Sequence, residues 1–169
     1  MDRTKRCIYI SLLIAMNIIL GRFFSIKTIF IQISFGFITL ALAGYMFGPI
    51  STGIVGAVSD VISTLIFPQG AYFPGFTISA FLTGMIYGFA FYKRQVNVKK
   101  IILTVILINV VVNIGLNTFW LSVLTGKAFI AIIGARTIKN LMIIPIQTFL
   151  IYVCIDRIGS FVKLNTLNN

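Results

Sequence analysis

The sequence contains no histidine and only three acidic residues, Asp2, Asp60 and Asp156, which lie far apart along the chain. General acid–base catalysis usually relies on a histidine or on suitably placed carboxyl groups, and a nucleophilic thiol needs a base beside it. The two cysteines, Cys7 and Cys154, have neither a neighbouring base nor the paired spacing of a metal or redox motif. We therefore expect no enzymatic activity, no bound metal and no cofactor.

The chain also lacks the glycine-rich loop ending in Lys-Ser or Lys-Thr that holds nucleotide phosphates. We infer that it does not hydrolyse ATP by itself. A transport function would therefore depend on facilitated movement, on an ion gradient or on a partner protein that supplies the energy.

Charged residues are scarce: they make up 10% of the 169 residues, whereas 59% are apolar and the mean hydropathy is +1.05. A soluble domain of this size could not cover so much apolar material with polar surface, so we expect a multi-pass protein of the cell membrane, embedded in the lipid bilayer. The net charge of +11 does not indicate a nucleic-acid partner, because no solvated domain is present to carry a basic binding surface. The basic N-terminus lacks a small-residue cleavage site after its apolar stretch, so we interpret it as the first membrane helix.

Charges, glycines and prolines divide the chain into six apolar segments. About 20 apolar residues cross a bilayer as a helix, and glycine and proline interrupt such helices. We predict an all-α fold, a bundle of six transmembrane helices that forms a single domain over residues 1–169. The helices are expected at residues 7–24, 31–47, 50–67, 74–92, 100–123 and 135–157.

The basic residues predict the orientation of this bundle, because short loops rich in Lys and Arg stay in the cytoplasm. Nine of the fourteen fall on one side if both termini are cytoplasmic: Arg3, Lys5, Arg6, Lys93, Arg94, Lys99, Lys100, Arg157 and Lys163. The other five, which fall on the outer side, are Arg22, Lys27, Lys127, Arg136 and Lys139. Snorkelling to lipid headgroups explains Lys27 and Lys127 as well as a binding role does. The remaining three are predicted inside helix ends, where a cation usually faces a cavity.

Arg136 and Lys139 are three residues apart and therefore share one face of the last predicted helix. We expect them in its first turn, where free backbone amides and the helix dipole add positive potential. No acidic residue is near them in sequence. Together with Arg22 at the outer end of the first helix, they predict a binding site for a carboxylate or a phosphate.

Polar side chains also occur within the predicted membrane helices. Three asparagines recur every four residues on the fifth helix, at Asn109, Asn113 and Asn117. Two interpretations stay open: these amides hydrogen-bond to neighbouring helices, or they line a ligand pocket beside Arg136. Trp120 follows on nearly the same face, and its alternative role is that of an interfacial belt residue. Asp60 is expected to pair with a ligand or another side chain rather than to relay protons, because the chain has no histidine.

Four stretches of the chain resemble the folate-binding S components of energy-coupling factor transporters. They are "SLLIAMNIILGRF" near the start, "FGPISTGIVGAVSDVIS" and "YFPGFTISAFLTGMIYG" in the middle, and "NTFWLSVLTGKAFIAIIGARTIKNLMIIPIQ" near the end. The resemblance runs from about Ile8 to Asp156, and the last stretch is the most specific. It implies a subunit of the bacterial plasma membrane that binds folate from outside. The subunit then docks onto a transmembrane coupling subunit with two ATPase subunits and topples to release the vitamin inside.

The resemblance also implies roles for individual residues. The two carboxylates of the folate glutamate tail would be bound by Arg22, Arg136 and Lys139. The candidates for holding the flat pterin ring are Asn117, Trp120 and Asp60. The stretch "FFSIKTIFIQISFG" after the first helix would cover the pocket as a lid, from which Gln32 and Phe35 reach inward.

In this family the docking surface is a pair of alanines four residues apart on the first helix, where small side chains allow close approach of another helix. The corresponding pair in this chain is Ser11 and Ala15. Relatives often carry proline just before the arginine of the last helix, where this chain has Ala135. We therefore expect docking to be preserved and the loop before Arg136 to be less rigid.

Other substrates and other classes of membrane protein are alternatives to this interpretation. The main rival is an S component for another vitamin, for example riboflavin, biotin or thiamine. Biotin, with one carboxylate, stays open, whereas cationic thiamine is disfavoured by the five outer basic residues. A facilitative anion transporter is an alternative that needs no coupling module. A channel or ion-coupled exporter would need a continuous polar path or paired carboxylates, and a structural scaffold would not need the cationic cluster.

Overall fold

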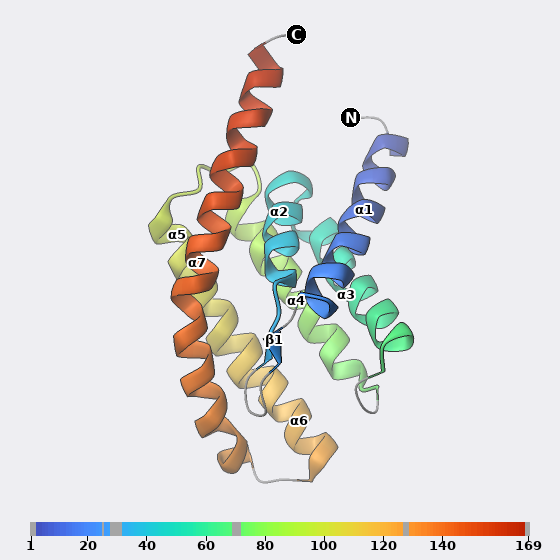
Figure 1. The fold of residues 1–169 in the computed structure, drawn as a ribbon, viewed down its shortest axis with the longest axis vertical. Helices are drawn as coiled ribbons and strands as arrows, with labels where there is room; N and C mark the ends of the chain where they lie inside the picture. The colour runs from blue at the N-terminus through green and yellow to red at the C-terminus, as the bar shows by residue number, and fades with distance from the viewer. Residues whose placement is uncertain (1–2, 25, 28–31, 69–71, 127–128, 168–169) are drawn as a thin grey trace.

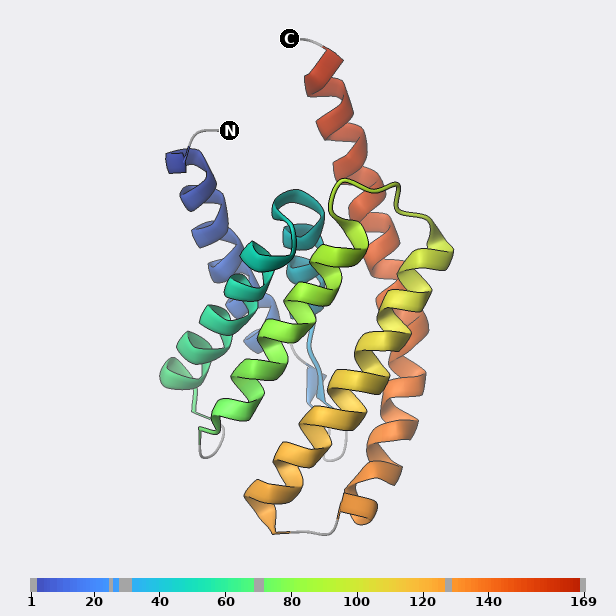
Figure 2. The ribbon, with the colours of Figure 1, turned by 180° about the vertical axis from the view of Figure 1, so that it is seen from behind.

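A computed structural model describes residues 3–24, 26–27, 32–68, 72–126 and 129–167 (Figure 1). The helices are α1 (Arg3–Arg22), α2 (Gly36–Phe47), α3 (Pro49–Ile66), α4 (Pro74–Phe91), α5 (Val98–Leu107), the π-helical segment η1 (Ile108–Leu116), α6 (Asn117–Thr125) and α7 (Phe129–Leu167). Two short strands, β1 (Ile26–Lys27) and β2 (Gln32–Ile33), lie between α1 and α2. α5, η1 and α6 follow one another without a gap and form one continuous helix. The start of α1 and the end of α7 lie at the same end of the bundle (Figures 1 and 2).

The predicted all-α membrane fold is confirmed. Within the described residues, five helices are long and apolar enough to cross a membrane: Thr4–Arg22, Pro49–Ile66, Pro74–Phe91, Val98–Thr125 and Arg136–Arg157. The sixth apolar helix, α2, has 12 residues, which at 1.5 Å per residue gives about 18 Å against a hydrocarbon core of about 30 Å. It packs against α1, α3, α4 and α7, and nine of its residues are buried.

Proline and glycine set the helix starts that agree with prediction. α3 and α4 begin at Pro49 and Pro74, within one residue of the expected positions. Proline suits the first helical position because its fixed φ is already helical and its missing amide would have no partner there. Gly48, between α2 and α3, has a φ of +81°, which glycine adopts without steric cost.

Other predicted boundaries are wrong. The helix predicted over 31–47 begins at Gly36, because Gln32 and Ile33 pair antiparallel with Lys27 and Ile26. The last helix, predicted over 135–157, begins at Phe129 and continues to Leu167. Gly134 lies within it, since one glycine costs a helix only about 1 kcal/mol relative to alanine.

The first and fifth predicted helices also differ from the structure at their ends. The first, predicted over 7–24, spans Arg3–Arg22, and the fifth, predicted over 100–123, spans Val98–Thr125. In both cases the helix starts before the apolar residues, in a first turn that contains lysine or arginine, at the end of the bundle that carries the two chain termini. Lysine and arginine are good helix formers, so hydropathy alone places these starts too late.

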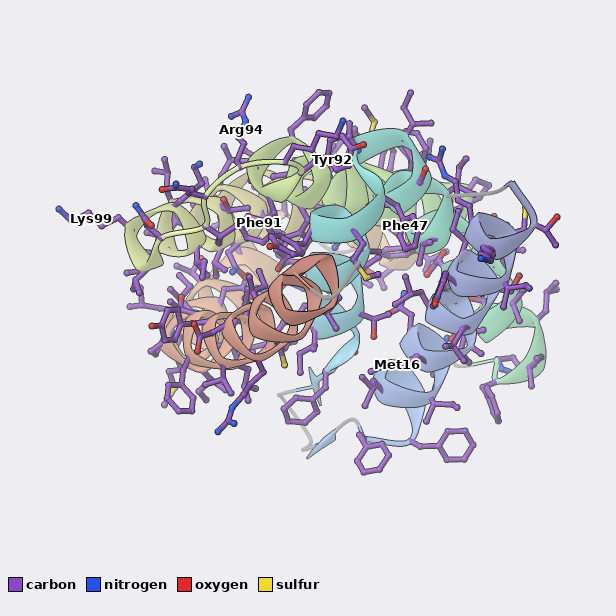
Figure 3. All side chains as sticks on the ribbon, turned by 90° about the horizontal axis from the view of Figure 1, so that it is seen from above. Met16, Phe47, Phe91, Tyr92, Arg94 and Lys99 are labelled. Atoms are coloured by element: carbon purple, nitrogen blue, oxygen red, sulfur yellow. The ribbon has the colours of Figure 1, made fainter. Side chains whose placement is uncertain are left out.

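Close helix contacts hold the half of the bundle near the chain ends together. A Cβ added at Gly84 of α4 would lie 2.3 Å from the carbonyl oxygen of Thr52 on α3, so only glycine allows this approach. The apolar core lies in the same half, where the Tyr87 and Phe91 rings are 5.7 Å apart. Figure 3 looks down from this end and shows Phe47 and Phe91 between the helices. The site described next borders this core, since Phe37, Leu40 and Tyr87 also line one of its cavities, and it extends toward the other end of the bundle.

Candidate functional site

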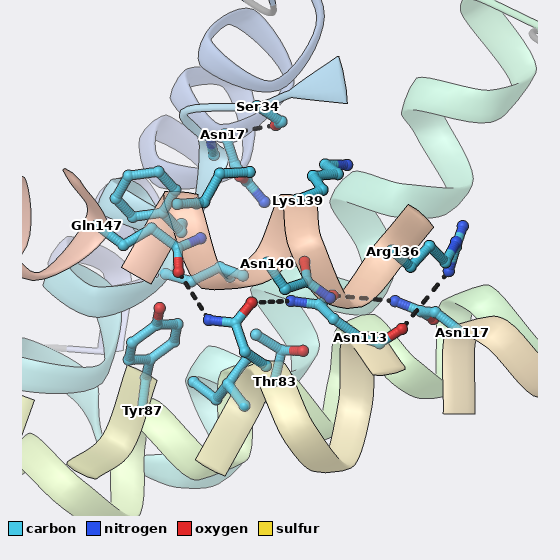
Figure 4. Close-up of a pocket in the computed structure, with 16 residues that line it drawn as sticks. Asn17, Ser34, Thr83, Tyr87, Asn113, Asn117, Arg136, Lys139, Asn140 and Gln147 are labelled. Atoms are coloured by element: carbon cyan, nitrogen blue, oxygen red, sulfur yellow. Dashed lines mark hydrogen bonds between the residues drawn. The ribbon is translucent and has the colours of Figure 1, made fainter. Parts of the chain in front are cut away.

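Two adjoining cavities lie between the helices, with volumes of about 340 Å³ and about 430 Å³. They share five lining residues, Asn17, Ser34, Leu40, Asn117 and Arg136, so they border one another. The first cavity extends between α2, α4, η1 and α7 (Figure 4), and the second extends between α1, α3 and α4. Residues from all the long helices therefore meet around one hollow region.

Three of the predicted outer cations converge on these cavities. Arg136 lines both of them, Lys139 lines the first, and Arg22 lines the second. All three residues are half-buried. The Nη1 of Arg136 donates a 3.5 Å hydrogen bond to the carbonyl oxygen of Asn113, and the Nε of Arg22 donates to the hydroxyl of Ser63. Among the described residues, none that lines the first cavity is acidic, so its electrostatic potential is positive.

The source of this positive potential differs from the prediction. Arg136 and Lys139 were expected in the first turn of the last helix, but α7 begins at Phe129. Arg136 is therefore seven residues into the helix, where the dipole effect, which falls off within the first turn, adds little. The side-chain charges themselves make the site attractive for an anion, and the helix end does not contribute.

The three asparagines of the fifth membrane helix form a hydrogen-bonded ladder along the wall of the first cavity (Figure 4). The amide nitrogen of Asn113 donates to the Asn109 Oδ1 at 3.0 Å, and that of Asn117 donates to the Asn113 Oδ1 at 3.2 Å. Asn109 donates in turn to the Oε1 of Gln147 on α7, at 3.0 Å. Asn109 thus bonds to a neighbouring helix, as one interpretation expects, and all three asparagines line a cavity. That a ligand binds to them stays a prediction.

The π-helical geometry of η1 explains how Arg136 is held. In η1 the backbone amide of Asn117 donates to the carbonyl of Val112, five residues back, whereas in an α-helix it would donate to Asn113. The carbonyl of Asn113 is thereby available to side chains. It accepts hydrogen bonds from the Thr118 hydroxyl at 3.3 Å and from Arg136. Short π-helical segments often occur at functional sites for such reasons.

Asp60 lines the second cavity together with Arg22 and Arg136. Its Oδ2 accepts a 2.8 Å hydrogen bond from the hydroxyl of Thr77, which also lies 3.0 Å from the hydroxyl of Tyr72. The carboxylate is thus connected to the start of α4 and remains at the cavity wall. This arrangement places one acceptor among two cations.

The three aromatic and lid candidates are less closely associated with the cavities. Trp120 is not among the described lining residues; its indole N–H donates to the Ser79 hydroxyl at 3.2 Å. Phe35 does not line them either, but its ring lies 6.3 Å from that of Phe37, which lines the first cavity. Gln32 belongs to β2, and its side chain lies outside the described part of the structure, as does all of Lys127.

Several polar lining residues were not predicted from the sequence. They are Asn17, Ser34, Thr83, Tyr87, Asn140 and Gln147. A helical periodicity could have identified two of them, because Asn140 and Gln147 lie four and eleven residues after Arg136 and so share its face of α7. Asn17 lies on α1, Ser34 lies between β2 and α2, and Thr83 and Tyr87 lie on α4, so only the packing brings them to one cavity.

The predicted docking pair is accessible. Ser11 and Ala15 are both exposed on α1, and they lie one turn apart on the same face. Exposed apolar side chains surround them, among them Ile8 and Leu12, each with 62% of its surface accessible. This face of α1 is therefore free to contact lipid or another helix.

Comparisons with known proteins agree with this architecture. The model of the family described as "ECF transporter, substrate-specific component" matches residues 5–155. The chain is 45% identical to a protein named folate transporter FolT from Clostridium novyi (strain NT), over 99% of both chains. It is 33% identical to a folate transporter FolT from Leuconostoc mesenteroides, over 91% of this chain and 86% of the other.

Two solved structures are also similar. The first, a crystal structure of FolT bound with folic acid, has a TM-score of 0.82 and 42% identity, covering 89% of this chain and 91% of the other. The second, the S component of a bacterial ECF transporter, has a TM-score of 0.70 and 25% identity, covering 96% and 99%. Matched over nearly its whole length by sequence and by fold, the chain belongs to the family of substrate-specific (S) components of energy-coupling factor (ECF) transporters.

Proposed function

We propose that this chain is the folate-binding S component of an energy-coupling factor transporter, a multi-pass protein of the cell membrane. The observation that carries the proposal is the convergence of Arg22, Arg136 and Lys139 on two adjoining cavities. Folate has two carboxylates on its glutamate tail, and three cations gathered on adjoining cavities suit such a ligand. Relatives named folate transporters, and a similar structure that contains folic acid, support the same substrate.

The cavity has two chemically different ends. Arg136 and Asn117 lie at one end of the polar ladder, and Gln147 and Tyr87 lie at the other (Figure 4). The glutamate tail of folate would lie near the cations, where its charge is neutralised. The pterin ring, which carries several hydrogen-bond donors and acceptors, would extend toward the amides of Asn109 and Gln147. Asn117 and Asp60 would bind at the boundary between ring and tail, and Trp120, Phe35 and Gln32 would act from the rim of the site.

Transport requires energy from other subunits, since the sequence carries no nucleotide-binding loop. Members of this family work with a transmembrane coupling subunit and two ATPase subunits. We place the docking surface on α1 at Ser11 and Ala15, whose small exposed side chains allow a second helix to approach closely. The chain itself acts as a single membrane domain that binds its substrate without catalysing a reaction.

The orientation follows from the charges and from the common location of the chain ends. Basic residues of α1, of the α4–α5 loop and of α7 lie at the end of the bundle that carries both termini (Figure 1). Cytoplasmic loops retain Lys and Arg, so this end faces the cytoplasm. The cavities, which extend toward the opposite end, then open toward the outside, where folate is captured.

Binding of radiolabelled folate to the purified full-length chain in detergent tests the proposal. We expect saturable binding at one site per chain, displaced by unlabelled folate and not by biotin at the same concentration. Displacement by biotin and not by folate would reassign the substrate. Folate uptake into vesicles that contain this chain alone would instead support a facilitative transporter and contradict the need for a coupling module.

A further inference from the structure

A third cavity lies on the outer surface of the bundle, between the start of α5 and the middle of α7. Its volume is about 410 Å³, and it shares no lining residue with the two anion-binding cavities. Val98 and Ile102 line it from α5, and Thr148, Phe149 and Tyr152 line it from α7. We call this cavity the α5–α7 groove.

The walls of the groove are apolar, and the groove is open at the surface of the bundle. Phe149 exposes 67% of its surface and Ile102 exposes 38%, so both side chains face the membrane. Pro145 lies in the interior of α7 and also lines the groove. Proline removes one backbone hydrogen bond and distorts the preceding turn of a helix, which accounts for a gap between α7 and α5 at this level.

One polar group in the groove lacks a partner. Thr148 is 91% buried, and no described group forms a hydrogen bond with its hydroxyl. Other threonines of this chain donate to the carbonyl four residues back, for example Thr104 at 2.7 Å and Thr137 at 2.8 Å. A buried hydroxyl without a partner is unfavourable by about 1–3 kcal/mol. The Thr148 side chain lines the groove, so a rotation about its χ1 bond would turn the hydroxyl toward an acceptor oxygen of a ligand bound there and remove that penalty.

The end of the groove nearest the chain termini is strongly basic. The segment 93–100 contains four basic and no acidic residues. Lys99 directly follows Val98, and Figure 3 shows Lys99 and Arg94 extending outward from this end of the bundle. On α7, Asp156 and Arg157, which follow the residues that line the groove, have opposite charges, so the net positive charge beside the groove comes from the segment 93–100. A negative group bound beside α5 would be attracted to it.

We propose that the α5–α7 groove is a binding site for one anionic glycerophospholipid. An acyl chain occupies the apolar groove between Ile102 and Phe149. An ester oxygen of the lipid accepts a hydrogen bond from the Thr148 hydroxyl, and the phosphate lies beside Lys99 and Lys100. Apolar walls, an unpaired buried donor and a basic end thus match the tail, the ester and the headgroup of one lipid molecule.

The location of the groove keeps it available during transport. α1, which carries the docking pair Ser11 and Ala15, lies on the opposite side of α2 from α5 and α7 in all views (Figures 1, 2 and 3). A coupling subunit bound to α1 would therefore leave the groove in contact with the bilayer. The proposal does not depend on folate being the substrate.

Native mass spectrometry of the delipidated full-length chain tests this site. The protein is titrated with phosphatidylglycerol and phosphatidylcholine of identical acyl chains, and the first binding event is compared. We expect phosphatidylglycerol to bind at least tenfold more tightly. Removing two lysines in K99Q/K100Q should weaken phosphatidylglycerol binding by about fivefold for each lysine and leave phosphatidylcholine binding unchanged.

Two matched controls distinguish the groove from general attraction to a basic protein. K5Q/R6Q removes the same charge from the same end of the bundle, on α1, and should retain the lipid preference. Ile102→Trp fills the groove, whereas Leu103→Trp adds the same bulk at a neighbouring exposed position that does not line it. We expect Ile102→Trp to abolish the tight binding of phosphatidylglycerol and Leu103→Trp to preserve it. Thr148→Val should weaken this binding about tenfold.

Several outcomes would overturn the proposal. They are equal affinity of the native chain for both lipids, an unchanged preference in K99Q/K100Q, or the same effect from both tryptophan variants. Circular dichroism and a monodisperse elution profile show whether each variant is folded. If Ile102→Trp does not fold, the paired charge variants and Thr148→Val still decide the question.

Discussion

Replacing Arg136 with alanine tests the proposed binding of the folate tail. Arg136 lines both cavities and is half-buried, and its guanidinium is held by the carbonyl of Asn113. Removing one partner of a buried charge pair costs about 2–5 kcal/mol. The site is only partly desolvated and Lys139 remains, so we expect the lower part of this range, about 2–3 kcal/mol. Folate should therefore bind about 30- to 160-fold more weakly.

The assay is equilibrium binding of radiolabelled folate to purified full-length chain, and its control is Arg157→Ala. Arg157 is exposed near the other end of the same helix, so this variant should keep the native affinity. Arg136→Lys keeps the charge but loses the planar fork that binds a carboxylate through two hydrogen bonds, and we expect an intermediate loss.

A modified ligand shows whether Arg136 acts on the tail. Folate in which both tail carboxylates are converted to amides carries no tail charge. The native chain should bind this diamide more weakly than folate, and Arg136→Ala should bind it as well as the native chain does. An equal loss of affinity for folate and for the diamide would refute the reasoning, because Arg136 would then act through the structure of the cavity.

Three further predictions concern the ladder, the helix packing and the docking surface. Asn109→Leu removes the amide that donates a hydrogen bond to Gln147, at a position where the side chain is 1% exposed. We expect folate to bind at least tenfold more weakly, measured by equilibrium binding, and the free energy of unfolding to fall by about 1–3 kcal/mol, measured by thermal denaturation. Gly84→Ala should lower the midpoint of thermal unfolding, because its Cβ would lie 2.3 Å from the Thr52 oxygen, whereas Gly134→Ala, with open space around the added methyl, should leave it unchanged or raise it; equal effects would contradict the packing argument. Ala15→Trp should prevent co-purification with the coupling subunit without changing folate binding. If the variant co-purifies with the coupling subunit as well as the native chain does, the docking surface lies elsewhere.

The overall fold was predictable because the bilayer imposes simple rules on a sequence. Backbone groups in hydrocarbon must be paired within the segment, so long apolar segments become helices whatever their detailed composition. Pro49 and Pro74 then mark helix starts because of their own covalent geometry. The strand pair β1–β2 escaped prediction because four paired residues leave no long periodic pattern to detect.

The site was predictable only in part. A cation or an amide in a membrane helix is costly unless it faces a cavity or a partner, so Arg22, Arg136, Lys139 and Asn117 could be identified from residue type alone. Trp120 could not be placed in this way, because its indole N–H donates to Ser79 on another helix. Tyr87 and Thr83 of α4 are too common in membrane helices to signal a cavity.

The sequence by itself determined that this chain is a multi-pass helical membrane protein, how its basic residues are distributed between the two ends, and which side chains are too polar to face lipid. The tertiary structure decided which of these side chains meet, that α7 begins well before Arg136, and that η1 leaves the Asn113 carbonyl available to its guanidinium. The physical reason is that hydropathy and charge act residue by residue. A cavity, in contrast, depends on the angles and spacings at which separate helices pack.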